Sequence, residues 1–332
     1  MSKIVVTGTT SWGTTLAILL ANNGHDVTLL ARSASEAQNL ETARQNARFL
    51  PELLFPPTMH VSDSIEYATD GAAMAIIAVP SNTLRDNVKA LAPYLDKHTI
   101  LLSATKGLEK GSSMRMSQVI EEELPKANLD NIAVLSGPNL AKEVAIRIPT
   151  STVIASKDIT VAQTIQAFLT SSSFRVYTNT DIIGVELGGA LKNVIAIGAG
   201  ISDGLGYGNN SKAAFITRGL AEITRLGKSA GADPLTFAGL AGLGDLVATC
   251  YSNLSRNRYV GHQLGEGYKL QDILSSMNNV AEGIDTTEAM MKLSGKLGIS
   301  MPITEAIHSV VFNHMDPKQA VMQLMERTAL AE

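Results

Sequence analysis

The sequence predicts an α/β fold for the first half of the chain, with a mostly parallel sheet and helices on both faces, followed by an all-α second domain. Two observations predict it. Up to Thr180, near-continuous apolar runs that end in small or polar turns alternate with helical patterns, as in parallel sheets that are covered on both faces. Beyond Thr180, strand-like runs largely disappear and long helical patterns take over. We therefore expect two domains, residues 1–185 and 186–332.

The expected elements follow from periodicity and turn residues. In the first half, strands are predicted at 4–6, 27–30, 75–79, 99–103, 132–135 and 151–155, and helices at 14–21, 83–95 and 114–123. In the second half, helices are predicted at 183–201, 212–231, 286–297 and 302–312.

Composition narrows the class of protein. A chain of 332 residues with 45% hydrophobic and 17% charged residues can build a core in each domain. The net charge of −4 without a basic block argues against a nucleic-acid partner. The first strand begins at Ile4, which leaves no room for a signal peptide, and no uncharged apolar run reaches the length of about 18 residues that a membrane span needs. We expect a soluble cytoplasmic protein without membrane insertion.

Metal and disulfide chemistry are not expected. Cys250 is the single cysteine, so no intrachain disulfide can form and no cysteine metal site exists. The six histidines show no ligand spacing. The sequence therefore predicts no metal.

The amino terminus reads strand, glycine turn, helix, strand, which is the pattern of a Rossmann-like dinucleotide-binding unit. Gly8 and Gly13 occupy the first and third glycine positions of its fingerprint, but Thr10 occupies the middle one. Two outcomes are open for Thr10: its side chain pushes the pyrophosphate outward, or its hydroxyl donates to it. A plain tight turn is the alternative interpretation of the motif.

The end of the second strand bears on cofactor choice. NAD sites usually have an acidic residue there, but this strand runs into Ala31-Arg32-Ser33 and the next carboxylate is Glu36. Arg32 and Ser33 would suit a 2′-phosphate, which favours NADP(H) over NAD(H). Alternatively, Arg32 stacks on the adenine or is solvated, and both cofactors are used.

The helical pattern over 185–197 is apolar on nearly all sides and therefore buried. Its two adjacent glycines, Gly188 and Gly189, imply that another segment approaches the backbone closely. Lys192 is the one cation in this stretch, and a buried ammonium needs a partner or gives up its proton. An ion pair with Glu186 is the structural alternative, but a six-residue separation places the two on roughly opposite helix faces. We favour proton transfer by Lys192.

Residues 239–258 and the sheet edge supply the remaining polar groups. Asp245 follows a glycine-rich turn, and Ser255-Arg256-Asn257 combine a guanidinium with two small donors, which suits a small anion. The alternatives are a solvated loop whose arginine caps a helix, and an Asp245 that merely caps the next helix. Lys106 and Gly137 follow predicted strands, where ligands of parallel sheets collect. This set suits hydride transfer to a carbonyl next to a phosphorylated group.

Long motifs in both halves extend the comparison to a family. The chain resembles the bacterial-type NAD(P)-dependent glycerol-3-phosphate dehydrogenases along essentially its full length. The segments that carry the resemblance are 11–14, 104–107, 136–138 with Ala141 and Glu143, 191–193, 205–227, 239–250, 255–258 and 280–283.

The resemblance implies a 6-phosphogluconate-dehydrogenase-like arrangement and reversible, NAD(P)H-dependent reduction of dihydroxyacetone phosphate to sn-glycerol 3-phosphate for glycerophospholipid synthesis. It implies a homodimer and a small phosphorylated substrate. Lys192 would be the general acid and base, with Lys106 orienting the substrate and Asp245 in the same polar network. The substrate-binding residues would be Lys106, Gly137, Asn139, Lys192, Asp245, Ser255, Arg256 and Asn257. The cofactor-binding residues would be Gly8, Thr10, Ser11, Trp12, Gly13, Arg32, Lys106, Ala141, Arg256, Val280 and Glu282.

Some alternatives stay open. Thr10 and Asn139 depart from the residues usual in the family, a glycine and a small hydroxyl residue. Trp12 suits ordinary core packing, and Glu282 suits a surface turn. At the level of the whole chain, the alternatives are a related dehydrogenase of 3-hydroxy acids or sugar acids, and a nucleotide-binding sensor without redox activity.

Overall fold

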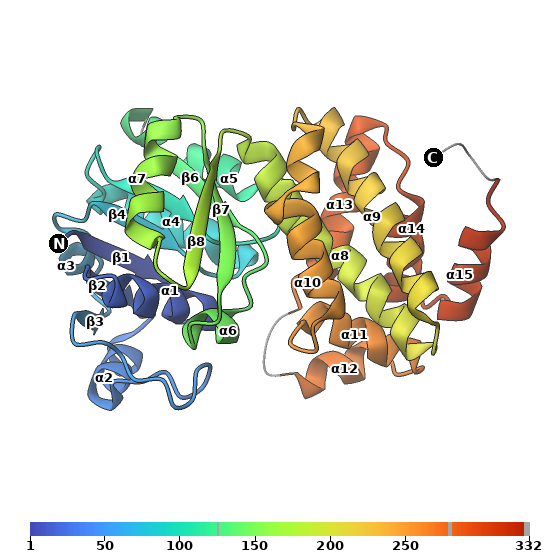
Figure 1. Ribbon diagram of the computed structural model, residues 1–332, viewed down its shortest axis with the longest axis horizontal. Coiled ribbons are helices and arrows are strands. Elements are labelled where there is room, and N and C mark those ends of the chain that lie inside the picture. Colours follow the sequence, from blue (N-terminus) through green and yellow to red (C-terminus); the bar gives the residue numbers. More distant parts are fainter. Residues whose placement is uncertain (125, 278–280, 329–332) are drawn as a thin grey trace. The chain divides into compact units, whose positions relative to one another are not determined.

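A computed structural model describes residues 1–124, 126–277 and 281–328 (Figure 1). The chain forms two compact units. The first comprises Met1–Lys106 and Arg115–Glu186, and the second comprises Gly107–Met114 and Leu187–Glu332. The short segment 107–114, expected in the first domain, packs with the second unit. Nζ of Lys292 donates to the carbonyl of Gly111, and Nζ of Lys296 donates to the carbonyl of Ser112 at 3.1 Å.

The first unit is built on an eight-stranded sheet with the order β3-β2-β1-β4-β5-β6-β7-β8. Every neighbouring pair is parallel except β6 and β7, which are antiparallel. The mostly parallel sheet of the predicted fold class is therefore confirmed. The strands are β1 (Lys3–Thr7), β2 (Asp26–Leu30), β3 (Met59–Ser62), β4 (Met74–Ile77), β5 (Ile100–Ser103), β6 (Ile132–Ser136), β7 (Thr150–Ser156) and β8 (Phe174–Asn179).

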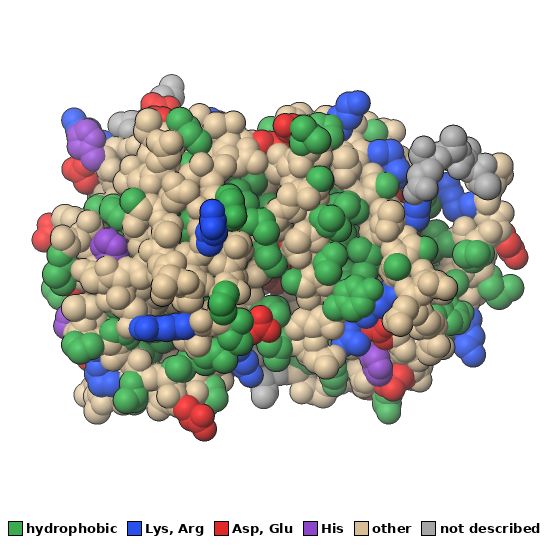
Figure 2. All heavy atoms as spheres, viewed as in Figure 1, with side chains coloured by type: hydrophobic (Ala, Val, Ile, Leu, Met, Phe, Trp, Pro, Cys, Tyr) green, Lys and Arg blue, Asp and Glu red, His purple; other side chains and the backbone are tan. Residues whose placement is uncertain are grey.

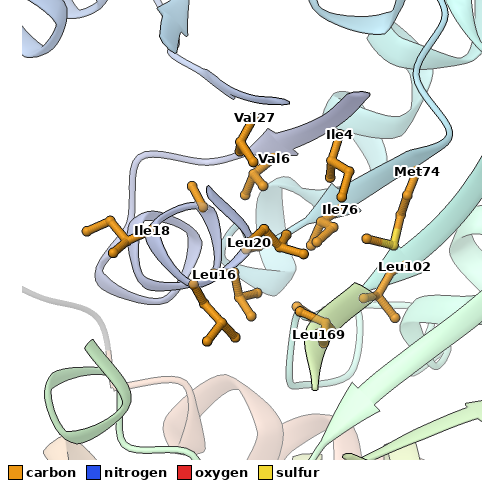
Figure 3. Packing of buried hydrophobic residues seen from close by; sticks show 14 of the residues in the cluster. Ile4, Val6, Leu16, Ile18, Leu20, Val27, Met74, Ile76, Leu102 and Leu169 are labelled. Carbon is orange, nitrogen blue, oxygen red and sulfur yellow. The ribbon is translucent and has the colours of Figure 1, made fainter. Parts of the chain in front are cut away.

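Helices lie between these strands in the chain. They are α1 (Ser11–Asn22), α2 (Ala34–Ala43), α3 (Ile65–Thr69), α4 (Leu84–Leu91), α5 (Met116–Glu123), α6 (Ala141–Ala145) and α7 (Ile159–Leu169). The core on one face of the sheet forms where α1 lies against the central strands: Leu16 and Leu20 pack with Val6 and Ile76, all fully buried (Figure 3). Burial of a leucine side chain stabilises the fold by about 1.5–3 kcal/mol, so this helix is fixed on the sheet.

The structure adds elements to those predicted. β3 and β8 were not predicted, and the helix expected over 83–95 ends at Leu91 and continues as a 3-10 turn, Ala92–Tyr94. Pro93 in that turn lacks a backbone N–H, which explains the break. These differences do not affect the central parallel strands, whose carboxyl ends are where ligands of such sheets bind.

The second unit is all-helical in the part of the chain that the structure describes. Its helices are α8 (Ile182–Gly204), which begins in the first unit, α9 (Asn209–Ser229), α10 (Asp245–Tyr251), α11 (Arg256–Gly265), α12 (Leu270–Ser276), α13 (Gly283–Leu297), α14 (Pro302–Phe312) and α15 (Pro317–Met325). A 3-10 turn (Pro234–Ala238) and a π-helical turn (Leu240–Gly244) precede α10.

Helix α8 is the apolar centre of this unit. It alone among the described helices is long and apolar enough to cross a membrane, but 89% of its most apolar window is buried inside the protein, as in a core helix. The predicted close approach to its glycines is present at Gly188. A Cβ there would lie 2.6 Å from the carbonyl oxygen of Ala241, so the turn before α10 packs directly on the α8 backbone.

A buried carboxylate fixes α14 in this unit. Glu222 of α9 accepts hydrogen bonds from the backbone N–H groups of Ile303 (2.7 Å) and Thr304 (3.3 Å). These donors belong to the first turn of α14, where helices lack internal partners. Burial raises the pKa of Glu222, although the bonds from α14 act in the opposite direction.

We expect Glu222→Ala to lower the free energy of unfolding by about 1–3 kcal/mol for each N–H left unpaired, measured by urea unfolding. Because the folded-state pKa of Glu222 lies above its unfolded value, its ionisation disfavours folding. That penalty is absent below the unfolded pKa and complete above the folded pKa, so it grows as the pH rises between them. Glu222→Gln should therefore weaken the pH dependence of stability in this range. Wild-type stability in the alanine variant would contradict this role.

Candidate active site

The glycine turn between β1 and α1 has the close packing that its fingerprint requires. Gly8 has φ of +112°, and a Cβ there would lie 2.6 Å from the carbonyl oxygen of Ala78. A Cβ on Gly13 would lie 2.0 Å from the carbonyl oxygen of Gly8. Any other residue at either position would force strand and helix apart. The turn therefore brings the start of α1 close to the strand end.

Thr10 has a structural role in this turn. It is the N-cap of α1: its Oγ1 accepts from the backbone N–H of Gly13 at 3.0 Å and donates to the carbonyl of Ala78 at 2.8 Å. A hydroxyl has one hydrogen, and in this conformation the carbonyl of Ala78 accepts it, so donation to a pyrophosphate, one of the two open outcomes, would require this bond to break. The branched residue is used to cap the helix.

The start of α1 is suited to an anion. The N–H of Gly13 is taken by Thr10 and the N–H of Thr14 donates to the carbonyl of Thr10, which leaves the N–H groups of Ser11 and Trp12 without intrahelical partners. No acidic residue lies in the first turn. The Trp12 ring packs against the core, and its indole nitrogen has no partner in the described residues. The packing alternative thus accounts for the side chain of Trp12, and its backbone remains the candidate ligand contact.

The end of β2 carries an ion pair that the sequence did not suggest. Glu36 accepts from the backbone N–H of Arg32 at 3.0 Å, from its guanidinium at 3.2 and 3.3 Å, and from the Thr9 hydroxyl at 2.8 Å. Burial alone would raise the pKa of Glu36, but the bonds from Arg32 and Thr9 outweigh it and lower the pKa. Ser33 is the N-cap of α2 and accepts from the Glu36 N–H. A carboxylate therefore lies at the strand end after all.

The carboxyl ends of β5 and β6 bring two predicted residues together. Nζ of Lys106 donates to the carbonyl of Gly137 at 3.0 Å. Gly137 has φ of +149° and its backbone packs against Thr152. Asn139 is turned toward β7: its Nδ2 donates to Ser151 O at 3.1 Å and its Oδ1 accepts from the Thr152 hydroxyl at 2.8 Å. Its substrate contact stays a prediction, since these bonds give it a structural task.

Ala141 begins α6, which packs against α1. The hydroxyl of Thr15 in α1 lies within hydrogen-bond distance of two carbonyl oxygens, that of Ser11 at 2.8 Å and that of Ala141 at 3.2 Å. The first turns of the two helices are thereby linked, which places Ala141 beside the helix that the glycine turn opens. Its predicted contact with a cofactor is compatible with this position.

In the second unit, Lys192 has a carboxylate partner. Its side chain is 8% exposed, and Nζ donates to Asp245 Oδ1 and to the hydroxyl of Thr249, which in turn donates to Asp245 at 3.3 Å. Glu186 is not the partner: it accepts from Arg115 and Ser117 in the first unit. Asp245 is the first residue of α10, with Gly244 as the N-cap and no side-chain cap. Its carboxylate therefore serves the ammonium rather than the helix end.

Thr249 was missed from the sequence, although it lies one helical turn after Asp245, a spacing that places both side chains on one face. The neighbouring Cys250 adds no nucleophile. Burial raises the pKa of its thiol to about 12, so the thiol is neutral at physiological pH. The ammonium of Lys192 therefore remains the predicted proton-transfer group of this cluster.

The predicted anion receptor forms the start of α11. Ser255 is the N-cap, and its Oγ accepts from the Arg258 N–H at 3.2 Å. Arg256 is exposed in the first turn and forms no ion pair with any described residue. Asn257 is buried, and its Oδ1 accepts from the Gly283 N–H at 2.9 Å. A cap is present, but Ser255 forms it rather than the arginine, and Arg256 presents a guanidinium at the helix N-terminus.

The neighbours of Lys192 and Arg256 meet at one residue of α13. A Cβ on Gly283 would lie 2.7 Å from the carbonyl oxygen of Asn193 and 2.8 Å from Oδ1 of Asn257. The backbone next to Lys192 and the side chain next to Arg256 are therefore packed on the same point. Glu282 immediately precedes α13 and is half-buried, and Val280 lies outside the described residues.

For two other kinds of ligand, metal ions and nucleic acid, the sequence predicts no site. Within residues 1–124, 126–277 and 281–328, no cluster of three or more histidine, cysteine, aspartate or glutamate side chains could hold a metal ion. On the face drawn in Figure 2, basic and acidic side chains are interspersed rather than gathered into one basic patch. The absence of a metal and of a nucleic-acid partner stays a prediction.

Comparison with known proteins assigns the family. Residues 3–162 match the model of the NAD-dependent glycerol-3-phosphate dehydrogenase N-terminus, and residues 181–322 match that of the C-terminus. Glycerol-3-phosphate dehydrogenases [NAD(P)+] from Dehalococcoides mccartyi and Geobacter sulfurreducens are 51% and 50% identical, over 100% and 99% of this chain and 93% and 98% of theirs.

A crystal structure of glycerol-3-phosphate dehydrogenase from Coxiella burnetii is similar with a TM-score of 0.91 at 39% identity, covering 98% of both chains. The similarity therefore extends over most of both units. The chain belongs to the NAD-dependent glycerol-3-phosphate dehydrogenase family.

Proposed function

We propose that the chain catalyses the reversible reduction of dihydroxyacetone phosphate to sn-glycerol 3-phosphate with NADPH or NADH, and that NADPH is preferred. The observation that carries this proposal is the buried Lys192–Asp245–Thr249 cluster in the same unit as the guanidinium of Arg256, which is exposed and forms no ion pair with a described residue. The ammonium of Lys192 can exchange a proton with a substrate oxygen, and the guanidinium of Arg256 can hold an anionic group.

The first unit fits a dinucleotide. The cradle formed by Gly8 and Gly13 has no space for a Cβ, and the N–H groups of Ser11 and Trp12 at the start of α1 suit a pyrophosphate. When bound, NAD(P)H supplies the hydride that reduces the ketone carbon. Lys106, fixed on the carbonyl of Gly137, would orient the substrate at this edge of the sheet.

Lys192 would transfer the proton to and from the substrate oxygen. In the direction of reduction its ammonium donates a proton to the ketone oxygen as the alcohol forms, and the resulting amine regains a proton from water. In the direction of oxidation the amine removes the proton of the hydroxyl. Asp245 and Thr249 hold Nζ in place, and Asp245 compensates the charge of the buried ammonium.

The phosphate would bind at α11. Arg256 offers a planar fork of donors that matches two phosphate oxygens, and the start of α11 adds a favourable dipole. The Ser255 hydroxyl and the Asn257 carboxamide nitrogen are further donors, because in the part of the chain that the structure describes only the oxygens of these side chains are engaged, each as an acceptor. We also propose a cytoplasmic homodimer that supplies glycerophospholipid synthesis, as the family resemblance implies.

The direct test is turnover. Purified protein with NADPH and dihydroxyacetone phosphate should oxidise the nicotinamide and form glycerol 3-phosphate, and the same assay with NADH gives the cofactor preference. A panel of 2-keto and 3-keto acids serves as the control for a related dehydrogenase. Faster turnover of a keto acid, or no turnover at millimolar triose phosphate, would refute the proposal.

A further inference from the structure

An open cavity of about 480 Å³ lies beyond the end of β2, entirely within the first unit. Its lining includes Arg32, Ser33 and Glu36 from the start of α2, and Asn46, Arg48 and Phe49 from the segment that follows α2. Its size is within the range of small-molecule sites, about 300–1,000 Å³. In dinucleotide-binding units, the adenosine ribose lies at the end of the second strand. The cavity therefore occupies the place of that ribose.

The segment after α2 is fixed to the glycine turn. Asn46 is buried, and its Nδ2 donates to the carbonyl of Thr9 and to the hydroxyl of Thr14, both at 2.9 Å. Phe49 packs against the core and Leu50 is buried within it. Arg48 is thus carried by a backbone that is held against the nucleotide-binding turn.

The two guanidinium groups that line the cavity differ in their partners. Arg32 is paired with Glu36, and the pKa of Glu36 is lowered, so this pair has no net charge at neutral pH. Arg48 lies over the ring of Phe49, 5.0 Å from its centroid, and forms no ion pair with a described residue. Arg48 therefore supplies the net positive charge of this cavity wall.

We propose that Arg48 recognises the 2′-phosphate of the adenosine ribose and that it, more than Arg32, sets the preference for NADP(H) over NAD(H). This inference rests on the proposed function for the identity of the dinucleotide. The Phe49 ring holds the guanidinium by a cation–π contact while leaving its N–H groups for phosphate oxygens. Glu36 repels the same phosphate, and its pairing with Arg32 reduces that repulsion.

The test compares Arg48→Ala with Arg175→Ala. Arg175 is a matched control, because it is exposed on β8 and lies over the ring of Tyr177 at 5.3 Å, so its removal changes the charge and the ring contact in the same way. Loss of a charged hydrogen bond should raise the KM for NADPH about ten- to hundredfold in the Arg48 variant. The KM for NADH should stay within about twofold, and the Arg175 variant should match the wild type.

Calorimetric binding of adenosine 2′,5′-bisphosphate and adenosine 5′-monophosphate gives a readout that needs no turnover. The Arg48 variant should weaken binding of the 2′-phosphorylated probe alone. Equal losses for both probes would mean that Arg48 stacks on the adenine, and unchanged binding would remove Arg48 from the site; either result overturns the inference. Absence of turnover with both cofactors would instead refute the proposed function, and the probe titration would still decide the role of Arg48.

Discussion

Lys192→Ala is expected to lower kcat by about 100- to 10,000-fold, the contribution typical of a positioned general acid. The KM for NADPH should change little, because Lys192 is not among the predicted cofactor-binding residues and the glycine turn proposed to hold the pyrophosphate belongs to the other unit. The loss follows from the chemistry: without the ammonium, the oxygen of the reduced ketone must take its proton from water. Steady-state kinetics at saturating cofactor and substrate measure this change.

Two further variants separate proton transfer from charge and from folding. Lys192→Arg keeps the charge beside Asp245, but a guanidinium does not release its proton, so kcat should remain low. Lys212→Ala removes an ammonium that is as buried as Lys192 and is paired with Asp203 in the same unit. It should cost stability while retaining most of kcat. Near-normal kcat in Lys192→Arg would show that Lys192 acts only through its charge.

Arg256→Ala is expected to raise the KM for dihydroxyacetone phosphate by about 10- to 150-fold, because a charged hydrogen bond contributes about 1.5–3 kcal/mol. The guanidinium is exposed and has no carboxylate partner among the described residues, so its removal should leave the fold intact. A fluorescence melting curve checks this, and initial rates over a range of substrate concentrations give the KM.

The substrate itself offers the control for Arg256. Dihydroxyacetone has the same ketone but no phosphate, so its low kcat/KM should be nearly equal in the wild type and in Arg256→Ala. Added inorganic phosphate should inhibit the wild type more than the variant. Equal losses for both ketones would mean that Arg256 acts on the fold or on the reacting carbonyl rather than on the phosphate.

Local signals in the sequence were sufficient to predict the fold class and to select candidate functional residues such as Lys192. The apolar stretch around Lys192 indicated burial, and burial implied a partner for the ammonium. The identity of that partner could not be obtained from spacing, because Asp245 lies 53 residues away and is brought to Lys192 by the packing of the turn before α10 on Gly188. The family resemblance supplied Asp245, whereas Thr249 could have been found from its helical spacing.

Glu36 was misjudged for a different reason. The four-residue distance from Arg32 suggested a carboxylate too far along the chain to occupy the strand end. Ser33 ends the extended segment and caps α2, so the first helical turn brings Glu36 back to Arg32. A serine followed three residues later by glutamate is a helix-start signal, and it could have predicted this return.

The antiparallel β7 and the unpredicted β3 and β8 show the limit of periodicity. A buried strand appears in the sequence as an apolar run whether its neighbour is parallel or antiparallel. The direction of a strand therefore cannot be predicted from this pattern, because it depends on tertiary pairing. β8 alternates between buried and exposed residues beside β7. Its outer position explains why it lacks the continuous apolar run by which the central strands were found.

Rescue of Lys192→Ala by small amines tests the central role of this lysine most directly. A primary amine such as ethylamine can occupy the space left by the side chain and donate the missing proton beside Asp245. The rate of triose phosphate reduction in this variant should increase with the concentration of protonated ethylamine, while tetramethylammonium, which has a charge but no proton to give, should have no effect. Equal stimulation by both cations, or a variant as active as the wild type without any amine, would contradict proton donation by Lys192.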